Sequence, residues 1–337
     1  MAGNSAVTAA VDRIRGGRFL VLGRAGMDLY ADPPGTLVED ATNFTPCLGG
    51  SSANIAVALT RHGLKSTLLT SVSDDAVGRF CINQLQRNNV STDHIRRVGG
   101  PARNSLALAE SRLKDARWVV YRKDAADLDM TAADVERLDF SSFDALVVAG
   151  LVLATEPSRS ASLRAVELSR QAGVCVVFDI DYRAFAWASP QEASAVCAQV
   201  AALSDIVVGN EEEFEVLSGF DSNGFAAASR LAATTAEIVV YKMGDAGAIT
   251  LHGSQQERTG IFPVEAVKPM GAGDAFLGSF LAALADGRSV RECVIRGSAA
   301  AAIVVTKVGC APAMPTTGQL DDFLAANGAP TEFVAVA

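Results

Sequence analysis

Hydrophobic and polar residues follow two repeating patterns along this chain. Short apolar runs rich in β-branched residues predict buried strands, and longer stretches whose apolar residues recur every three or four positions predict amphipathic helices. The strands are expected at 18–22, 66–71, 145–149, 174–179, 206–208, 238–241 and 248–251. The helices are expected at 52–62, 75–88, 158–172, 190–203, 211–217, 224–233, 273–286, 290–307 and 317–326.

Two segments among these strands, Ala145–Ala149 and Val174–Phe178, contain apolar residues only. A strand that is apolar throughout is buried on both faces, which is typical of a mostly parallel sheet with helices on each side. The sequence therefore predicts a three-layer α/β fold. A chain of 337 residues is long enough for one large unit of this kind.

Two segments interrupt the alternation of strands and helices. Residues 27–48 contain prolines and a glycine and are expected to be irregular, whereas residues 102–121 predict two strands, 105–110 and 117–121, joined by a polar turn at 112–115. Both segments follow strands of the main sheet, so a small second sheet is expected above its carboxyl edge. Open α/β sheets bind ligands at that edge.

The charge of the chain limits its partners. It has 38 acidic and 29 basic residues, a formal net charge of −9. A negative field repels nucleic acids and anionic membrane surfaces, so neither is expected as a partner. An anionic small molecule would have to be held by a local group of Arg, Lys and backbone N–H groups.

The cysteines and the apolar segments indicate a cellular compartment. The six cysteines show no C-x-x-C pair and no His at ligand spacing, and we expect reduced thiols. The N-terminal residues show no signal-peptide pattern, and no stretch reaches about 18 uninterrupted apolar residues. These features predict a cytoplasmic protein.

The strongest chemical signal is Gly271-Ala272-Gly273-Asp274 at the start of an expected helix. Such a turn leaves backbone N–H groups unpaired at the positive end of the helix dipole, which favours an anion. A carboxylate there suits a base that takes a hydroxyl proton while the N–H groups hold a phosphoryl group. Asp274 also fits an ordinary helix N-cap, and these four residues alone do not distinguish the two.

Other polar residues lie near expected strand ends and helix starts. Gly50 precedes a helix whose first turn carries Asn54, which suits contacts with sugar hydroxyls or with solvent. Asp28 is expected at the carboxyl end of the first strand, where α/β folds place ligand-facing carboxylates. The sequence contains no Walker P-loop, and neither 23–28 nor 271–273 completes a dinucleotide-binding fingerprint.

Asn210 and Glu213 follow the strand expected at 206–208. Their oxygens suit Mg²⁺ held through water beside phosphates. Acidic residues at a helix N-terminus are also favoured by the helix dipole alone. Arg122 and Arg183 each follow a strand, and two arginines in one cleft would hold a carboxylate.

The order of these motifs resembles the ribokinase or PfkB family of ATP-dependent carbohydrate kinases. The set consists of Gly-Gly-x-x-Ala-Asn at 49–54, Asn-x-x-Glu at 210–213, Lys-Met-Gly-x-x-Gly at 242–247 and Gly-Ala-Gly-Asp at 271–274. The resemblance covers residues 18–325. It implies a three-layer ribokinase-like kinase domain with a small β-sheet lid built from about 29–48 and 102–122.

The same resemblance implies roles for individual residues. Asp274 would be the catalytic base, and the anion hole would consist of Gly271, Ala272 and Gly273. The ATP site would include Asn210, Lys242, Gly244 and Gly247, with a helix wall beside the adenine around Ala299 and Ile303. Mg²⁺ would be held through water by Asn210 and Glu213. The sugar would contact Asp28, Gly50 and Asn54, and its acid group would contact Tyr121, Arg122 and Arg183.

Within the family, the nearest resemblance is to members that phosphorylate 5-dehydro-2-deoxygluconate in inositol breakdown. It rests on residues 23–29, 121–122, 126–128, 178–183, 187, 307 and 313–315. It implies transfer to a primary hydroxyl of a small acid sugar. The alternative acceptors are 2-keto-3-deoxygluconate, fructose and ribose, and the alternative from another class is a non-catalytic binding protein that responds to a sugar or nucleotide. The lid would hinge near Gly49-Gly50 and pair between subunits of a homodimer.

One departure from the family pattern concerns the residues before the Gly-Ala-Gly-Asp motif. Many relatives carry Asp-Thr-Thr or a similar triplet there, whereas this chain has Lys268-Pro269-Met270. Lys268 would add positive charge near the phosphates or face solvent, and activation by a monovalent cation stays open. Asp181 stands where some keto-acid kinases have Asn, which leaves the acceptor open as well.

Overall fold

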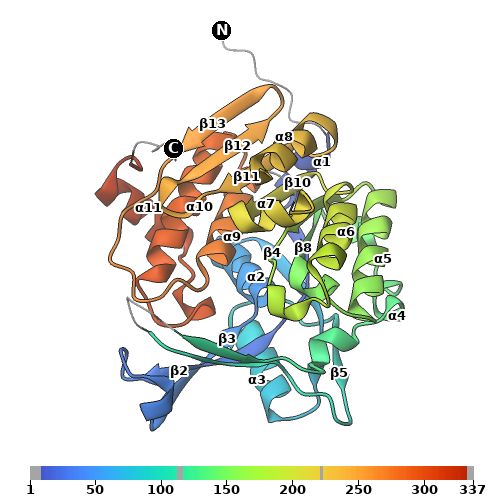
Figure 1. Ribbon diagram of the computed structural model, residues 1–337, viewed down its shortest axis with the longest axis vertical. Helices are drawn as coiled ribbons and strands as arrows, with labels where there is room; N and C mark the ends of the chain where they lie inside the picture. Colours follow the sequence, from blue (N-terminus) through green and yellow to red (C-terminus); the bar gives the residue numbers. More distant parts are fainter. Residues whose placement is uncertain (1–8, 112–116, 221–222, 332–337) are drawn as a thin grey trace.

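The computed structural model describes residues 9–111, 117–220 and 223–331. They form a large sheet between helices and a smaller sheet at one end of the molecule (Figure 1). The strands of the large sheet are, in spatial order, β13 (Gln255–Thr259), β12 (Ala248–His252), β11 (Ile238–Lys242), β10 (Ile206–Asn210), β9 (Cys175–Asp179), β8 (Ala145–Ala149), β1 (Arg18–Leu22), β4 (Lys65–Ser73) and β5 (Ile95–Val98). Neighbouring strands from β11 to β5 pair in parallel. Strand β12 pairs antiparallel with β11, and β13 pairs antiparallel with β12.

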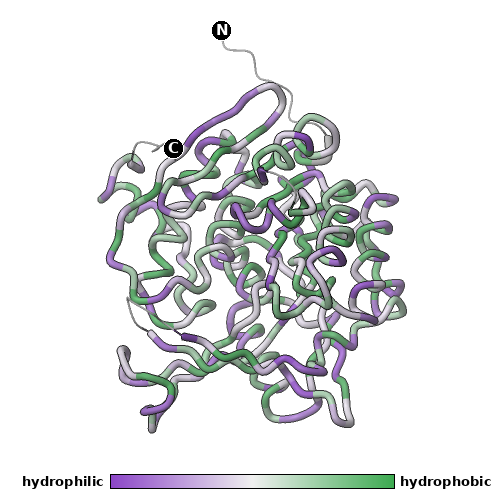
Figure 2. The backbone as a smooth tube through the Cα atoms, in the orientation of Figure 1, coloured by the Kyte–Doolittle hydropathy of each residue, from purple (hydrophilic) through white to green (hydrophobic). Residues whose placement is uncertain are grey.

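Helices cover both faces of the large sheet. The helices of one face are α1 (Ala9–Asp12), α2 (Ser51–Arg61), α3 (Ala76–Arg87), α9 (Ala272–Ala285), α10 (Val290–Val305) and α11 (Thr317–Asn327). The helices of the other face are α4 (Ala132–Val135), α5 (Ser158–Gln171), α6 (Pro190–Ala201), α7 (Glu211–Leu217) and α8 (Gly224–Thr234). The outer helices alternate hydrophobic and hydrophilic stretches, as Figure 2 shows on the α5 and α6 side.

The central strands supply side chains to two separate hydrophobic cores. In β1, Phe19 and Val21 belong to the core under α2 and α9, whereas Leu20 and Leu22 belong to the core under α5 and α6. Successive side chains of a strand point to opposite faces, so a continuous apolar run fills both cores. The predicted three-layer α/β fold is confirmed.

The smaller sheet has the strand order β3 (Asn43–Gly49), β2 (Gly26–Asp32), β6 (Leu106–Ala109) and β7 (Trp118–Tyr121). The prediction that residues 27–48 are irregular is therefore wrong, since β2 and β3 pair antiparallel from Gly26 opposite Gly49 to Asp32 opposite Asn43. Pro46 lies inside β3 and made this strand difficult to recognise from the sequence. The sheet accepts this proline because β3 is an edge strand, which has one side free of ladder hydrogen bonds.

The remaining predicted elements are present, with ends within two residues of the expected positions. The expected turn at 112–115 lies outside the described residues. Besides β2 and β3, the sequence analysis missed β5 and β13, which are short edge strands of the large sheet, and the four-residue helices α1 and α4. In the three described ranges, no helix has both the length and the apolar character to cross a membrane. All six cysteines are buried and free.

Candidate active site

The candidate active site lies where three adjacent parallel strands end. Strands β9, β10 and β11 end at Asp179, Asn210 and Lys242. Their register places Asn210 opposite Lys242 and Asp179 opposite Val208. The carboxyl ends of parallel strands meet at one edge of a sheet, so these polar residues come together although they are far apart in the sequence.

Helix α9 brings the Gly-Ala-Gly-Asp motif to this edge. Gly271 is its N-cap residue, with φ +85°, and a Cβ atom there would lie 2.8 Å from Cys310 Sγ. Glycine is therefore required for both the backbone conformation and the close packing. Because the cap is Gly271, Asp274 lies inside the first turn, and the N-cap interpretation of Asp274 is wrong. Gly271, Ala272, Gly273 and Asp274 are the residues whose N–H groups have no partner within the helix.

The Asp274 carboxylate is held by a neighbouring helix. Asn54 Nδ2 donates a hydrogen bond to Asp274 Oδ2 at 2.7 Å. The two helices can approach because Gly278, one turn after Asp274, has no side chain: a Cβ atom there would lie 2.3 Å from Ala58 Cβ, one turn after Asn54. The contact between Asn54 and Asp274 thus depends on close packing of α2 against α9.

The environment of Asp274 prepares it to accept a proton near neutral pH. Burial raises the pKa of Asp274 to about 6, with a further increase from the Asp181 charge. The hydrogen bond from Asn54 and the charges of Arg183 and Lys242 act in the opposite direction. A carboxylate with this pKa is mostly ionised at pH 7 and still a useful base.

Three more carboxylates surround Asp274. Burial raises the pKa of Asp179 well above its ordinary value, and the charges of Asp181, Glu213 and Asp274 raise it further, against Lys242. Burial likewise raises the pKa of Glu213, again opposed by Lys242. This acidic cluster is defined as Asp179, Asp181, Glu213 and Asp274. In the part of the chain that the structure describes, the charges of Arg183 and Lys242 oppose these pKa shifts, and four carboxylates near two cations favour further positive charge.

Asp181 organises one side of the cluster. Ser51 Oγ donates to Asp181 Oδ2 at 2.7 Å, and Arg183 Nη2 lies 2.9 Å from Asp181 Oδ1. Arg183 Nη1 lies 3.8 Å from Glu213 Oε1. The sequence analysis did not include Asp179 or Asp181 among the site residues, although their position after a strand was a usable signal.

Asn210 and Glu213 bind each other. The Glu213 N–H donates to Asn210 Oδ1 at 2.9 Å, and the Asn210 N–H donates to Glu213 Oε2 at 2.7 Å. These two hydrogen bonds form a capping box at the start of α7. Asn210 and Glu213 therefore have a structural role at this helix N-terminus. Within the described ranges, no group of three His, Cys, Asp or Glu side chains is arranged to hold a metal ion. A divalent ion here would depend on water and phosphate oxygens as ligands.

The residues expected around ATP fall into two groups. Lys242 reaches toward α9, where its Nζ lies 5.8 Å from the centre of the Phe276 ring. Gly244 and Gly247 form the turn after β11, both with positive φ. Ala299 and Ile303 lie in α10 and are buried in the core beneath the site.

Asp28 lies elsewhere than the sequence predicted. It belongs to β2 of the small sheet, not to the carboxyl end of the first strand, because the chain enters a second sheet soon after β1. Burial raises the pKa of Asp28, and the charges of Arg24 and Lys268 oppose this. Next to it, Gly50 has φ +101°, and a Cβ atom there would lie 2.4 Å from the Arg24 carbonyl oxygen.

Several buried polar atoms of the described residues lack a partner, and three of them belong to residues near the point where the chain passes from β1 into the small sheet and α2. Among the described residues, Arg24 Nε, Asp28 Oδ1 and Asn54 Oδ1 are buried and lack a hydrogen-bond partner. Buried polar groups are normally paired, so these atoms indicate a place for ligand hydroxyl or acid groups. Arg24, whose Nη1 donates to Ser105 Oγ at 3.0 Å, was missed by the sequence analysis. Its position just after β1 was the available signal.

Tyr121 and Arg122 have different environments. Tyr121 ends β7 and is 60% exposed. Arg122 is buried, and its Nη2 lies 2.6 Å from Asp127 Oδ2. Arg122 and Arg183 therefore each hold a carboxylate of the protein, and among the described residues the two arginines pair with different carboxylates.

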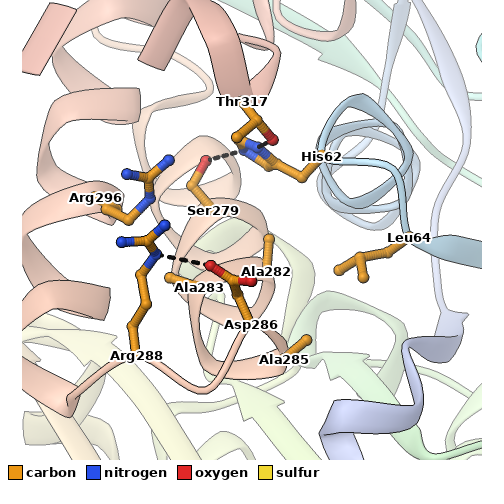
Figure 3. Close-up of a pocket in the computed structure, with 10 residues that line it drawn as sticks. All are labelled: His62, Leu64, Ser279, Ala282, Ala283, Ala285, Asp286, Arg288, Arg296 and Thr317. Atoms are coloured by element: carbon orange, nitrogen blue, oxygen red, sulfur yellow. Dashed lines mark hydrogen bonds and ion pairs between the residues drawn. The ribbon is translucent and has the colours of Figure 1, made fainter. Parts of the chain in front are cut away.

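A separate cavity of about 260 Å³ lies toward the C-terminal end of α9 (Figure 3). His62 crosses its upper side, with Nε2 at 2.8 Å from Ser279 Oγ and Nδ1 at 3.1 Å from Thr317 Oγ1. Burial lowers the pKa of His62 to about 4, helped by the Arg296 charge. The residues that line this cavity include none of the expected site residues.

Comparisons with known proteins agree with this geometry. Residues 18–317 match the pfkB family carbohydrate kinases. The chain is 37% identical over 310 residues to the 5-dehydro-2-deoxygluconokinase of Photobacterium profundum, covering 90% of this chain and 94% of that protein. It is 35% identical over 312 residues to 5-dehydro-2-deoxygluconokinase 2 of Bacillus cereus, covering 91% and 94%. A solved Vibrio cholerae fructokinase double mutant, in a form with fructose, ADP and potassium ion, has a TM-score of 0.81 and 26% identity over 91% of this chain and 98% of that chain.

Proposed function

We propose, since the chain belongs to the pfkB family of carbohydrate kinases, that it transfers the γ-phosphoryl group of ATP to a primary hydroxyl of 5-dehydro-2-deoxygluconate. The observation that carries the chemistry is Asp274, a carboxylate with a pKa of about 6 beside the unpaired N–H groups of α9. The observation that supports this acceptor is the likeness to two kinases named for it.

The reaction assigns a task to each part of the site. The acceptor hydroxyl gives its proton to Asp274 as its oxygen forms a bond to the γ-phosphorus, and the bond from that phosphorus to the β-phosphate oxygen breaks to release ADP. The N–H groups of residues 271–274 hold the oxygens of the transferring group, and Lys242 adds positive charge beside them. Because such transition states are loose, positioning and charge neutralisation supply most of the acceleration.

Mg²⁺ fits the donor set of this site. The acidic cluster supplies hard oxygen atoms and an excess of negative charge, which suit Mg²⁺ held through its water shell. Asn210 and Glu213 would hold those waters. When bound with the nucleotide, the ion neutralises phosphate charge.

The sugar is proposed to lie between the two sheets. Asp28 and Asn54 would accept hydrogen bonds from its hydroxyls through their unpaired oxygens. Arg24 and Arg183 would bind its carboxylate, while Arg122, which is paired with Asp127, would hold the shape of the small sheet nearby.

The small sheet is proposed to act as a lid, within one kinase domain that spans residues 18–325. Its closure about Gly49-Gly50 would exclude water as a competing acceptor. On its edge strand β7, Trp118, Val119 and Tyr121 are 49%, 47% and 60% exposed. An exposed apolar edge strand favours pairing with another strand, so we propose a homodimer formed through the lids. The free cysteines suit a reducing cytoplasm.

The function is tested by incubating the protein with Mg·ATP and a panel of sugars and sugar acids while ADP release is followed. We expect the highest kcat/KM with 5-dehydro-2-deoxygluconate. A higher value for 2-keto-3-deoxygluconate, fructose or ribose would assign the acceptor differently within the same chemistry. Ligand binding without ADP release from any acceptor would contradict the kinase and favour a binding protein.

A further inference from the structure

Lys268 lies inside the protein, in a pocket of backbone oxygens. The residue is 1% exposed, which excludes the solvent-facing position that the sequence left open. Its Nζ donates to Met270 O at 2.6 Å and to Val304 O at 3.4 Å, and Cys310 Sγ lies 3.8 Å away. The ammonium group is therefore surrounded by acceptors.

This pocket has the chemistry of a monovalent-cation site. Carbonyl oxygens around a buried centre are the ligands that replace the hydration shell of K⁺ in proteins. An ammonium carries the same single charge and supplies three donors. Since the Lys268 ammonium already contacts Met270 O and Val304 O, an added K⁺ on those oxygens would meet both a steric clash and like charge. The residues therefore do not fit a bound monovalent cation here.

The two carbonyls belong to the parts of the fold that border the anion hole. Val304 lies in the last turn of α10, at the negative end of the helix dipole, and its carbonyl oxygen also accepts from the Lys307 N–H at 3.2 Å. Met270 directly precedes Gly271, the N-cap of α9. The peptide bond between Met270 and Gly271 is planar, so the Met270 C=O and the Gly271 N–H point in opposite directions. A contact that holds the Met270 carbonyl therefore also fixes the direction of the Gly271 N–H.

Cys310 extends the same pocket toward the small sheet. Its Sγ lies 3.3 Å from Tyr30 Oη in β2, and it packs against Gly271. Burial raises the pKa of the Cys310 thiol to about 11, and the Lys268 charge opposes this. The Lys268 ammonium thus lies between the start of α9 and the sheet proposed as the lid.

We propose that Lys268 is a built-in monovalent cation, which fixes the Met270–Gly271 peptide at the anion hole and makes the kinase independent of added K⁺ or Na⁺. Lys268 acts as a positioning residue, through the backbone it holds. The inference rests on the proposed kinase function for its effect on turnover, but its effects on unfolding and nucleotide binding can be measured without any acceptor sugar.

The test compares Lys268→Ala and Lys268→Met with the wild-type protein. Turnover is measured in KCl, NH₄Cl and choline chloride at one ionic strength. We expect wild-type turnover to be the same in all three salts within about twofold. Lys268→Ala, which leaves room for an ion, should lose about tenfold or more in choline and recover in KCl or NH₄Cl through kcat, with little change in the sugar KM. Lys268→Met should lose turnover without recovery, because its side chain fills the pocket.

Lys307→Ala is the matched control, because Lys307 is an exposed lysine just after α10 and near the same loop. It should behave like the wild type. A second readout is the midpoint of thermal unfolding together with the affinity for Mg·ADP. K⁺ should raise both for Lys268→Ala above the values in choline, and should leave both unchanged for the wild type.

Three results would overturn the inference. The first is a turnover of the wild type that is several-fold higher in KCl than in choline chloride. The second is a turnover of Lys268→Ala in choline chloride that equals that of the wild type. The third is a loss of turnover in Lys268→Ala that neither K⁺ nor NH₄⁺ restores. If no acceptor is phosphorylated, the proposed function fails by itself, and the unfolding and Mg·ADP measurements still decide the role of Lys268. If neither variant folds, K⁺ dependence of the wild type in those measurements would contradict the inference.

Discussion

At the scale of single residues, the properties of Asp274 follow from its neighbours. Burial and the Asp181 charge raise its pKa, while Asn54, Arg183 and Lys242 stabilise the ionised form. As a result of these opposing effects, Asp274 is mostly ionised at pH 7 and still accepts a proton readily. Two predictions concern this balance.

Replacing Asp274 by Asn should reduce turnover by about two to four orders of magnitude, because the amide cannot accept the hydroxyl proton. Binding of Mg·ADP should be largely unchanged, since the N–H groups of the α9 turn remain in place. Initial rates and calorimetric titration with Mg·ADP test both parts. Near-normal turnover in Asp274→Asn would exclude it as the base.

The pH profile should show an acidic limb near the pKa of Asp274. Its raised pKa means that it becomes protonated as the pH falls through about 6, so turnover should decline there. Asp181→Asn removes a charge that raises this pKa and should move the limb to lower pH. Asn also tolerates the φ of +36° at this position. A limb that stays in place or moves upward in Asp181→Asn would contradict the assignment.

The arginines test the class of sugar. Arg24→Ala and Arg183→Ala should each lower kcat/KM for the acid sugar about tenfold or more beyond any loss for fructose, because only the acid sugar offers a carboxylate. Kinetics with both sugars measure this selectivity, and Arg87→Ala, an exposed arginine at the end of α3, serves as the control. Equal losses with both sugars would rule out a carboxylate contact.

At the scale of the elements, side chains connect helices that are distant in sequence. Asn54 connects α2 to α9, and Ser51 connects α2 to the segment after β9. His62, just after α2, bonds Ser279 in α9 and Thr317 in α11. These bonds place the start of α2 against the site and fix its other end against the C-terminal helices.

The His62 connection should make stability depend on pH. Its pKa falls from the ordinary 6.5 to about 4 because of burial and Arg296, with Arg61 acting in the same direction and Asp321 opposing. The folded protein therefore resists protonation, so this contribution is complete above pH 6.5 and is lost as the pH falls through about 4. Compared with His62→Gln, the wild type should lose on the order of 1–2 kcal/mol more between pH 7.5 and 4.5. Urea unfolding of both proteins at the two pH values measures this, and equal losses would contradict it.

The small sheet shows how sequence patterns can fail at the scale of an element. β2 alternates buried and partly buried residues, but Pro33 and Pro34 follow it and Pro46 lies inside its partner β3. Proline lowers the local strand signal, and an edge position is what makes it acceptable. Whether β3 would be an edge strand depends on the arrangement of the whole sheet, which the local sequence does not reveal.

At the scale of the whole molecule, two sheets enclose one polar region. The carboxyl edge of the large sheet and the helices α7 and α9 beside it supply the acidic cluster, and the small sheet supplies Asp28. The net charge of −9 gives no help in holding anions. The proposed substrates depend on local groups instead: Arg24, Arg183, Lys242 and the start of α9.

The exposed edge strand predicts the assembly. Val119→Lys should shift the proposed dimer toward monomer, because a charge on the apolar edge of β7 disfavours strand pairing. Sedimentation equilibrium over a range of concentrations measures this. Val264→Lys changes another exposed valine outside the small sheet and should leave assembly unchanged. A wild-type protein that stays monomeric at every concentration would contradict the proposed dimer.

The sequence by itself determined the layered α/β fold, the positions of most helices and of the central strands of the large sheet, and the family through its motif order. It could do so because burial on one or two faces imposes a period on hydrophobic residues, and because turns and helix starts need particular residues nearby. The roles inferred for the single site residues stay predictions. Only the tertiary structure decided that Asp28 lies in the small sheet, that Asp181 joins Ser51 to Arg183, that Arg24 has an unpaired buried nitrogen, and that Lys268 is buried. These facts depend on strand order and helix packing between residues far apart in the chain, which no local pattern records.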